Sequence, residues 1–211
     1  MEQLKIKKER NKKGFLLVII GILLILIGSS VLIYRYYDNK ETKQIEDNSV
    51  EIFFEEEIHD EEIKQEEPKE EKPQVIINYV AILEIPKINL KRGLVDKNSY
   101  LNNVDRNIYT LKETTYPNDE SVSHILLASH SGNSSVSFFR NLKRLDNNDL
   151  IYLYYDNVKY TYKVYKHYEI EKTGTMKMDL SSEDDITLIT CKSNTNKQFV
   201  YKAILTNKES Y

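Results

Sequence analysis

The sequence predicts a mainly β protein: an eight-stranded β-barrel with short helices, preceded by one transmembrane helix and an acidic stalk. Three observations predict this fold class. An uncharged apolar run lies near the N-terminus, a strongly acidic stretch follows it, and from Tyr79 onward short β-branched and aromatic runs alternate with polar turns. A chain of 211 residues accommodates one ordinary domain plus such appendages.

The apolar run extends from Phe15 to Tyr34 and contains no charged residue. At ~1.5 Å per helical residue it reaches roughly 30 Å, the thickness of a bilayer's hydrocarbon layer. Lysines and arginines crowd the preceding residues, so the positive-inside rule keeps the N-terminus in the cytoplasm. We therefore expect a cytoplasmic basic tail over residues 1–14, a transmembrane helix over 15–34, and an extracellular remainder.

The alternative for this run is a cleaved signal peptide with its small-residue site at Gly28–Ser30. The apolar residues Val31–Tyr34 extend the run beyond the usual length of a signal core, which favours the membrane anchor. Both interpretations export the rest of the chain.

Residues 35–78 are expected to form an acidic extracellular stalk. Between Glu41 and Lys72 there are 14 acidic residues against four lysines, so charge repulsion and scarce apolar surface predict an extended or partly helical spacer. An alternative is an amphipathic turn that contacts the membrane or the domain. Its apolar residues would be Val50, Phe53, Phe54 and Ile58.

The folded domain is expected over residues 79–211. Asp156–Asn157 predicts a tight hairpin turn, and Ser137–Leu145 has the apolar spacing of one short helix. Eight short strands predict a closed or nearly closed barrel. The strands are expected at Ala81–Ile85, Gly93–Val95, Ile108–Leu111, His124–Ser129, Leu150–Tyr155, Lys159–Ile170, Ile186–Cys191 and Phe199–Leu205.

Charge and composition exclude several classes of function. Residues 73–211 carry 18 basic and 16 acidic residues, so no basic field is available for nucleic acid. No Cys/His grouping has zinc spacing, and no glycine-rich phosphate loop is present. Cys191 is the only cysteine, so no internal disulfide can form, and a free thiol in an exported domain needs a reason.

The most informative pair of residues is Cys191 and His130. Cys191 ends an apolar strand, and His130 follows another, so both are expected at one rim of the barrel. A cysteine nucleophile needs a neighbouring base, because its free thiol is mostly protonated at neutral pH. Of the other histidines, His59 lies in the stalk, His167 lies within a Tyr-rich strand, and His124 is expected as an exposed turn residue.

At these residues the sequence resembles the sortases, membrane-anchored cysteine transpeptidases of Gram-positive bacteria. The resemblance lies in "ASHSG" at Ala128–Gly132 and "TLITC" at Thr187–Cys191, behind a membrane helix and the "ILEIPKINL" that begins the domain at Ile82–Leu90. It covers Tyr79 to roughly Lys208. The subclass stays open.

The resemblance implies an eight-stranded sortase-type barrel in which Cys191 attacks a backbone carbonyl of an LPxTG-like sorting signal and forms a thioester. His130 would protonate the leaving amine and deprotonate the incoming one. The implied partners are surface proteins or pilins with a C-terminal sorting signal, and the acceptor is an amine of a cell-wall precursor or a pilin lysine. No cofactor is required. Specificity is expected in Tyr168–Asp185.

One family residue is absent from this sequence. Sortases carry an arginine on the strand after the cysteine, which donates hydrogen bonds to the substrate carbonyl, but no arginine follows Cys191 here. Gln198 takes its place by alignment and Lys197 offers a charge, yet neither reproduces a guanidinium fork. Because the two alternate along a strand, only one can point at the thiol. Arg140 and Arg144 are further alternatives.

Two other functions compete with the transpeptidase. The missing arginine favours a degenerate sortase that binds the sorting signal without turning it over. A cysteine protease outside the family would need an Asn or Asp to orient His130, and the sequence singles none out.

Overall fold

A computed structural model describes residues 2–58, 76–118, 121–173 and 180–211. The chain divides into two compact units, Met1–Gln44 and Ile45–Tyr211. Two regions singled out by the sequence lie partly outside the described residues: residues 59–75 of the expected stalk and residues 174–179 of the expected specificity segment.

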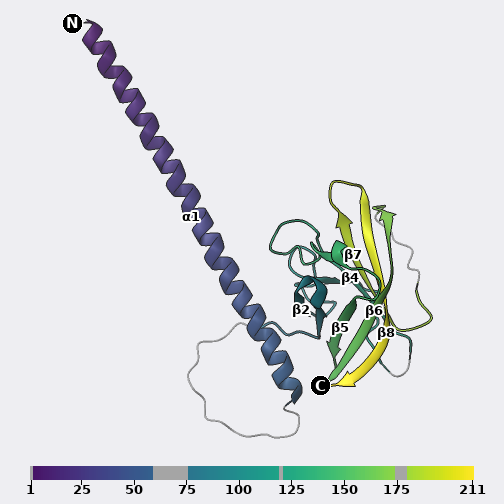
Figure 1. Cartoon of the computed structure of the whole chain (residues 1–211). Coiled ribbons are helices and arrows are strands. Elements are labelled where there is room, and N and C mark those ends of the chain that lie inside the picture. The colour runs from purple at the N-terminus through teal and green to yellow at the C-terminus, as the bar shows by residue number, and fades with distance from the viewer. Residues whose placement is uncertain (1, 59–75, 119–120, 174–179) are drawn as a thin grey trace, which may run out of the picture. The chain divides into compact units, whose positions relative to one another are not determined.

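The N-terminal helix α1 (Glu2–Ile58) is continuous (Figure 1). Within Gly14–Glu55 it is long and apolar enough to cross a membrane. The hydroxyls of Ser29 and Ser30 donate to backbone carbonyls one turn earlier, so these polar residues fit within the apolar run. The expected stalk is therefore helical up to Ile58, because no glycine or proline interrupts the helix after Gly28.

The last turns of α1 belong to the same compact unit as the barrel. The Ser49 hydroxyl accepts a hydrogen bond from the backbone N–H of Ile77, at 3.0 Å, and Phe54 packs edge-on against the rings of Tyr154 and Tyr211. Of the two forms considered for this segment, the amphipathic one that contacts the domain is observed.

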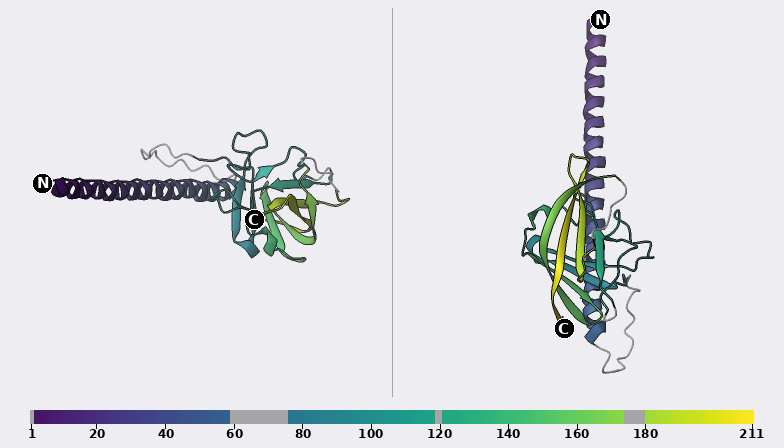
Figure 2. Two further views of the ribbon diagram at one scale, coloured as in Figure 1. Left: turned by 90° about the horizontal axis from the view of Figure 1, so that it is seen from above. Right: turned by 90° about the vertical axis from the view of Figure 1, so that its right-hand side faces the viewer.

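The barrel is built from eight strands in the order β2-β1-β5-β6-β8-β7-β4-β3, and it is nearly closed, as the fold class predicted. Figure 2 shows the two longest strands, β6 and β8 (green and yellow), curving side by side. Among the described ladders β4 and β7 alone run parallel. The strands are β1 (Ala81–Ile85), β2 (Leu90–Leu94), β3 (Tyr109–Thr110), β4 (His124–Ala128), β5 (Leu150–Tyr155), β6 (Val158–Glu171), β7 (Asp185–Lys192) and β8 (Lys197–Ser210).

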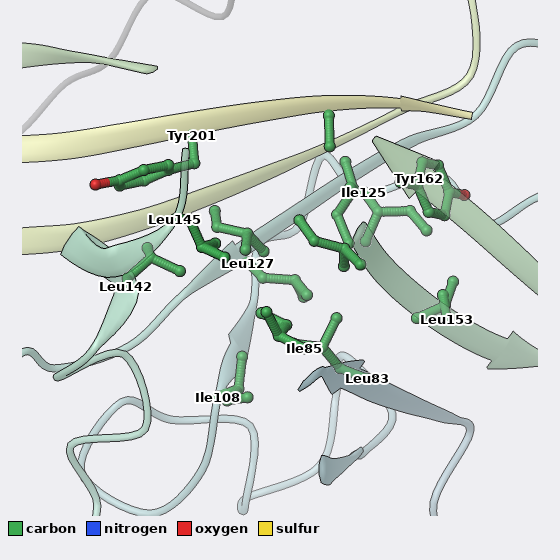
Figure 3. Close-up of a cluster of buried hydrophobic side chains, with 14 of the residues drawn as sticks. Leu83, Ile85, Ile108, Ile125, Leu127, Leu142, Leu145, Leu153, Tyr162 and Tyr201 are labelled. Atoms are coloured by element: carbon green, nitrogen blue, oxygen red, sulfur yellow. The ribbon is translucent and has the colours of Figure 1, made fainter. Parts of the chain in front are cut away.

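The core fills the barrel with side chains from alternate positions of its strands (Figure 3). Ile125 and Leu127 of β4 point into it, as do Ile186 and Leu188 of β7. The residues that alternate with them along β7, including Thr187 and Ile189, therefore face outward. Asp156 and Asn157 both have positive φ, at 52° and 57°, which confirms the tight hairpin predicted between β5 and β6.

The expected helix over Ser137–Leu145 was wrong. A series of turns occupies this segment, with a single 3-10 helix, η2 (Leu142–Arg144). The N–H of Phe139 donates to the carbonyl of His130, at 3.1 Å, and not to a carbonyl four residues earlier as in an α-helix. A second 3-10 helix, η1 (Pro86–Ile88), follows β1.

Strand β2 begins at Leu90 rather than at the expected Gly93. All five of its residues pair with β1, including the polar Lys91 and Arg92. Gly93 is required here because a Cβ atom would lie 2.3 Å from the ring of Tyr79.

Candidate active site

The parallel pairing of β4 with β7 determines where the two predicted reactive residues lie. The register matches His124 with Asp185 and continues to Ala128 with Ile189. One residue further, the N–H of Ser129 donates to the carbonyl of Ile189, at 3.2 Å. Continued for two residues beyond its last pair, this register predicts that His130 and Cys191 lie level at one rim of the barrel.

The thiol of Cys191 is half-buried at the end of β7 and is not part of the core cluster. Alternation along β7 places it on the outward face, with Ile189. Its neighbour Thr190 fixes the strand end, because the Thr190 hydroxyl donates to the carbonyl of Ser129 at 2.8 Å.

A cavity of about 410 Å³ opens at this rim and is bordered by Cys191. Three of its lining residues are cations and none is acidic, although the whole chain has a net charge of −3. The lining residues are Ser131, Asn133, Phe139, Arg140, Asn141, Lys143, Thr190, Cys191, Lys192, Ser193 and Phe199.

His130 is partly exposed, and 40% of its side chain is accessible to solvent. Its Nε2 lies 3.0 Å from Oδ1 of Asp105. Asp105 is the partner of His130 that the sequence did not reveal. It belongs to a turn between β2 and β3, 25 residues before the histidine, and no motif or spacing connects the two.

The two candidates for the missing arginine lie on opposite faces of β8. Gln198 pairs directly with Cys191 across the β7–β8 ladder, and directly paired residues have side chains on the same face. Lys197 pairs with Lys192 instead.

Lys197 takes part in an ion-pair cluster with residues of β6. Its Nζ lies 3.6 Å from Glu169 of β6 and 3.9 Å from Glu171. The hydrogen bond from Lys192, followed by the charges of Lys192 and Lys197, lowers the pKa of Glu169. The ammonium group of Lys197 is therefore paired with carboxylates of β6.

The two arginines proposed as substitutes also differ in position. Arg140 borders the cavity with Cys191, and its guanidinium donates to the carbonyls of Ser134 and Ser137, at 2.5 and 3.3 Å. Arg144 lies exposed in η2 and does not line the cavity.

The expectation that His124 is an exposed turn residue was wrong. Only 15% of its side chain is exposed, and its Nδ1 lies 2.7 Å from Oδ1 of Asp185. Lys202 of β8 approaches the other oxygen of the same carboxylate at 3.3 Å. Lys202 is itself buried, so the Asp185 carboxylate lies between His124 and a buried cation.

Within the described ranges, no group of three or more His, Cys, Asp or Glu side chains is arranged to hold a metal ion.

Comparison with known proteins assigns the fold to a family. The family model of the sortase domain matches residues 83–206, and the chain belongs to the sortase family. Members of this family are cysteine transpeptidases. This membership removes the support for a cysteine protease outside the family. No curated protein matches the chain.

Solved structures of three sortase classes share the fold. Sortase A of Listeria monocytogenes is 23% identical and has a TM-score of 0.52, covering 63% of this chain and 90% of its own. Sortase C1 of Streptococcus agalactiae is 22% identical, with a TM-score of 0.52 and coverage of 60% and 67%. The Sortase D5 transpeptidase of Clostridium perfringens is 22% identical, with a TM-score of 0.56 and coverage of 80% and 99%.

Proposed function

We propose that the protein is a membrane-anchored sortase that cleaves an LPxTG-like sorting signal and transfers the attached protein to an amine. The observation that supports this proposal is the parallel β4–β7 register, whose continuation past Ala128 and Ile189 leads to His130 and Cys191. The apolar stretch of α1 supports a single-pass anchor with the N-terminus in the cytoplasm and the barrel outside.

The reaction follows from the two groups at the rim. The Cys191 thiolate attacks the carbonyl carbon of the scissile peptide bond, and His130 donates a proton to the departing amine, so a thioester and a free amine result. An incoming amine then attacks the thioester, gives its proton to His130 and releases Cys191 as the thiolate. A cell-wall precursor or a pilin lysine would supply that amine.

Gln198 is our candidate for the group that stabilises the developing oxyanion. It shares a face with Cys191, and its amide NH₂ can donate hydrogen bonds. Arg140 is the alternative donor, because it borders the same cavity as the thiol. Lys197 is less suited than either, because it lies on the other face beside Glu169.

The proposal is tested by trapping the thioester. The full-length chain in detergent is incubated with an LPxTG-type peptide, and its intact mass is measured by mass spectrometry. We expect an adduct with the mass of the acyl fragment, absent from Cys191→Ala and formed more slowly by His130→Ala. A peptide with an N-terminal glycine, added as the acceptor amine, should yield the transfer product in place of the hydrolysis product.

The same experiment distinguishes the proposed function from the competing one. Peptide binding with no adduct, under conditions in which an active sortase forms one, would identify the chain as a sortase-like binding module. The missing arginine is the feature that favours that outcome.

A further inference from the structure

The contact between His130 and Asp105 joins two segments that are both held firmly by the fold. His130 is fixed on its own side because its carbonyl accepts the N–H of Phe139, at 3.1 Å, one residue beyond the bond from Ser129 to β7. The backbone of the histidine is thus tied to the strand that carries the thiol.

The turn that carries Asp105 is fixed as well. The side-chain oxygen of Asn103 accepts the N–H of Asp105, at 2.9 Å, and the carbonyl of Asn103 accepts the N–H of Asn107, at 2.8 Å. These bonds determine the direction in which Asp105 leaves the turn.

Buried amides connect this turn to the barrel on both sides. Asn107, with 3% of its surface exposed, donates to the carbonyl of Gly93 and accepts from Nε of Arg92. Asn102 exchanges two hydrogen bonds with the backbone of Thr110, at 2.8 and 3.0 Å. Because buried polar groups must be satisfied, both amides hold the exposed turn in one conformation.

We propose that Asp105 is a positioning residue for His130. Its carboxylate accepts a hydrogen bond from Nε2–H, which selects the tautomer with a free Nδ1 and limits rotation of the ring. Nδ1 is then the nitrogen that takes the proton from the thiol or the incoming amine and returns it to the leaving amine. This inference rests on the proposed transpeptidase function. It assigns to Asp105, which does not line the cavity, the role of orienting the histidine.

The size of the effect follows from exposure. The Asp105 side chain is 78% exposed, so water competes for its oxygens and the pair is weaker than a buried one. We expect Asp105→Ala to lower kcat for thioester formation about fivefold, with KM unchanged, because an exposed charged pair contributes roughly that factor. Asp105→Asn keeps a carbonyl acceptor and should retain most of the rate.

The test uses the full-length chain in detergent with ¹⁵N-labelled histidine, at a pH where the ring is neutral. We expect the His130 nitrogen shifts of the parent protein and of Asp105→Asn to report the Nε2–H tautomer, and those of Asp105→Ala to report a mixture. His130→Gln assigns the signal. Glu113→Ala removes an exposed carboxylate elsewhere and should change neither the shifts nor kcat.

The spectroscopic readout separates this inference from the proposed function. A parent protein that forms no thioester but loses its Nε2–H signature in Asp105→Ala supports the positioning role and contradicts the transpeptidase. Unchanged tautomer shifts in Asp105→Ala overturn the positioning role, whatever happens to kcat.

Discussion

The two ends of the β4–β7 pair carry similar residues in different surroundings. At one end His124 lies opposite Asp185, and at the other His130 comes level with Cys191, with the same offset of 61 residues. The first histidine is 15% exposed beside a buried carboxylate that also pairs with Lys202, whereas the second is 40% exposed beside Asp105.

Burial makes the difference between these two ends. At the His124 end the buried Asp185 carboxylate of β7 contacts His124 of β4 and Lys202 of β8, so this cluster links three strands. At the His130 end the imidazole is partly exposed, and the half-buried thiol borders a cavity. The same strand pair thus provides a closed polar cluster and an open reactive one.

The largest contrast is expected from Cys191→Ala. This change should abolish the thioester completely, yet alter the free energy of unfolding by less than about 1 kcal/mol, because one small half-buried side chain replaces another. Mass spectrometry and urea unfolding of the same preparation measure both effects. A collapse in stability would mean that the thiol serves the core rather than the chemistry.

The opposite pattern is expected from Asp185→Ala. Removing the carboxylate leaves Lys202 buried without its counter-ion, which should cost about 3 to 5 kcal/mol in the free energy of unfolding. The double change Asp185→Leu with Lys202→Met should recover most of that loss, since it removes both charges together. If Asp185→Ala unfolds at the same urea concentration as the parent, the cluster is not structural.

The sequence was sufficient to predict most of the strands and to single out Cys191 and His130 as candidates, because both inferences depend on local patterns. Apolar runs that end in polar loops marked Ser129 and Thr190 as the last residues before the expected rim. The sequence could not predict Asp105 or the ion pair of His124, because both depend on which strands lie side by side. The helix predicted over Ser137–Leu145 was wrong because apolar residues in a series of turns can have the same spacing as those on one face of a helix.

A third prediction concerns alkaline pH, which should act on stability at the buried end. Burial raises the pKa of Tyr162, and Asp184 beside it adds to the increase. Burial alone would lower the pKa of Lys202, but the Asp185 carboxylate and the Tyr165 hydroxyl outweigh it and raise that pKa. Burial also raises the pKa of Tyr116 to about 12.

The direction of this pH dependence of stability follows from proton linkage. Each of these groups keeps its proton to a higher pH when folded, so its contribution is fully present below its unfolded pKa near ~10 and is lost as pH rises further. We expect the free energy of unfolding to fall by roughly 1 to 3 kcal/mol between pH 10 and 12. Urea unfolding across this range measures it, and Tyr162→Phe should flatten the slope. An equal slope in that variant would locate the effect elsewhere.

The smallest expected effect tests which residue assists the thiol at the open end. Because Gln198 lies directly opposite Cys191, Gln198→Arg should supply the guanidinium that the family uses and raise the rate of thioester formation about tenfold. Lys197→Arg should give no such gain, since that side chain lies on the face of Glu169. A gain at position 197 alone would mean that β8 is shifted by one residue. No gain at either position, together with a loss in Arg140→Gln, would assign the oxyanion donor to the loop that borders the cavity.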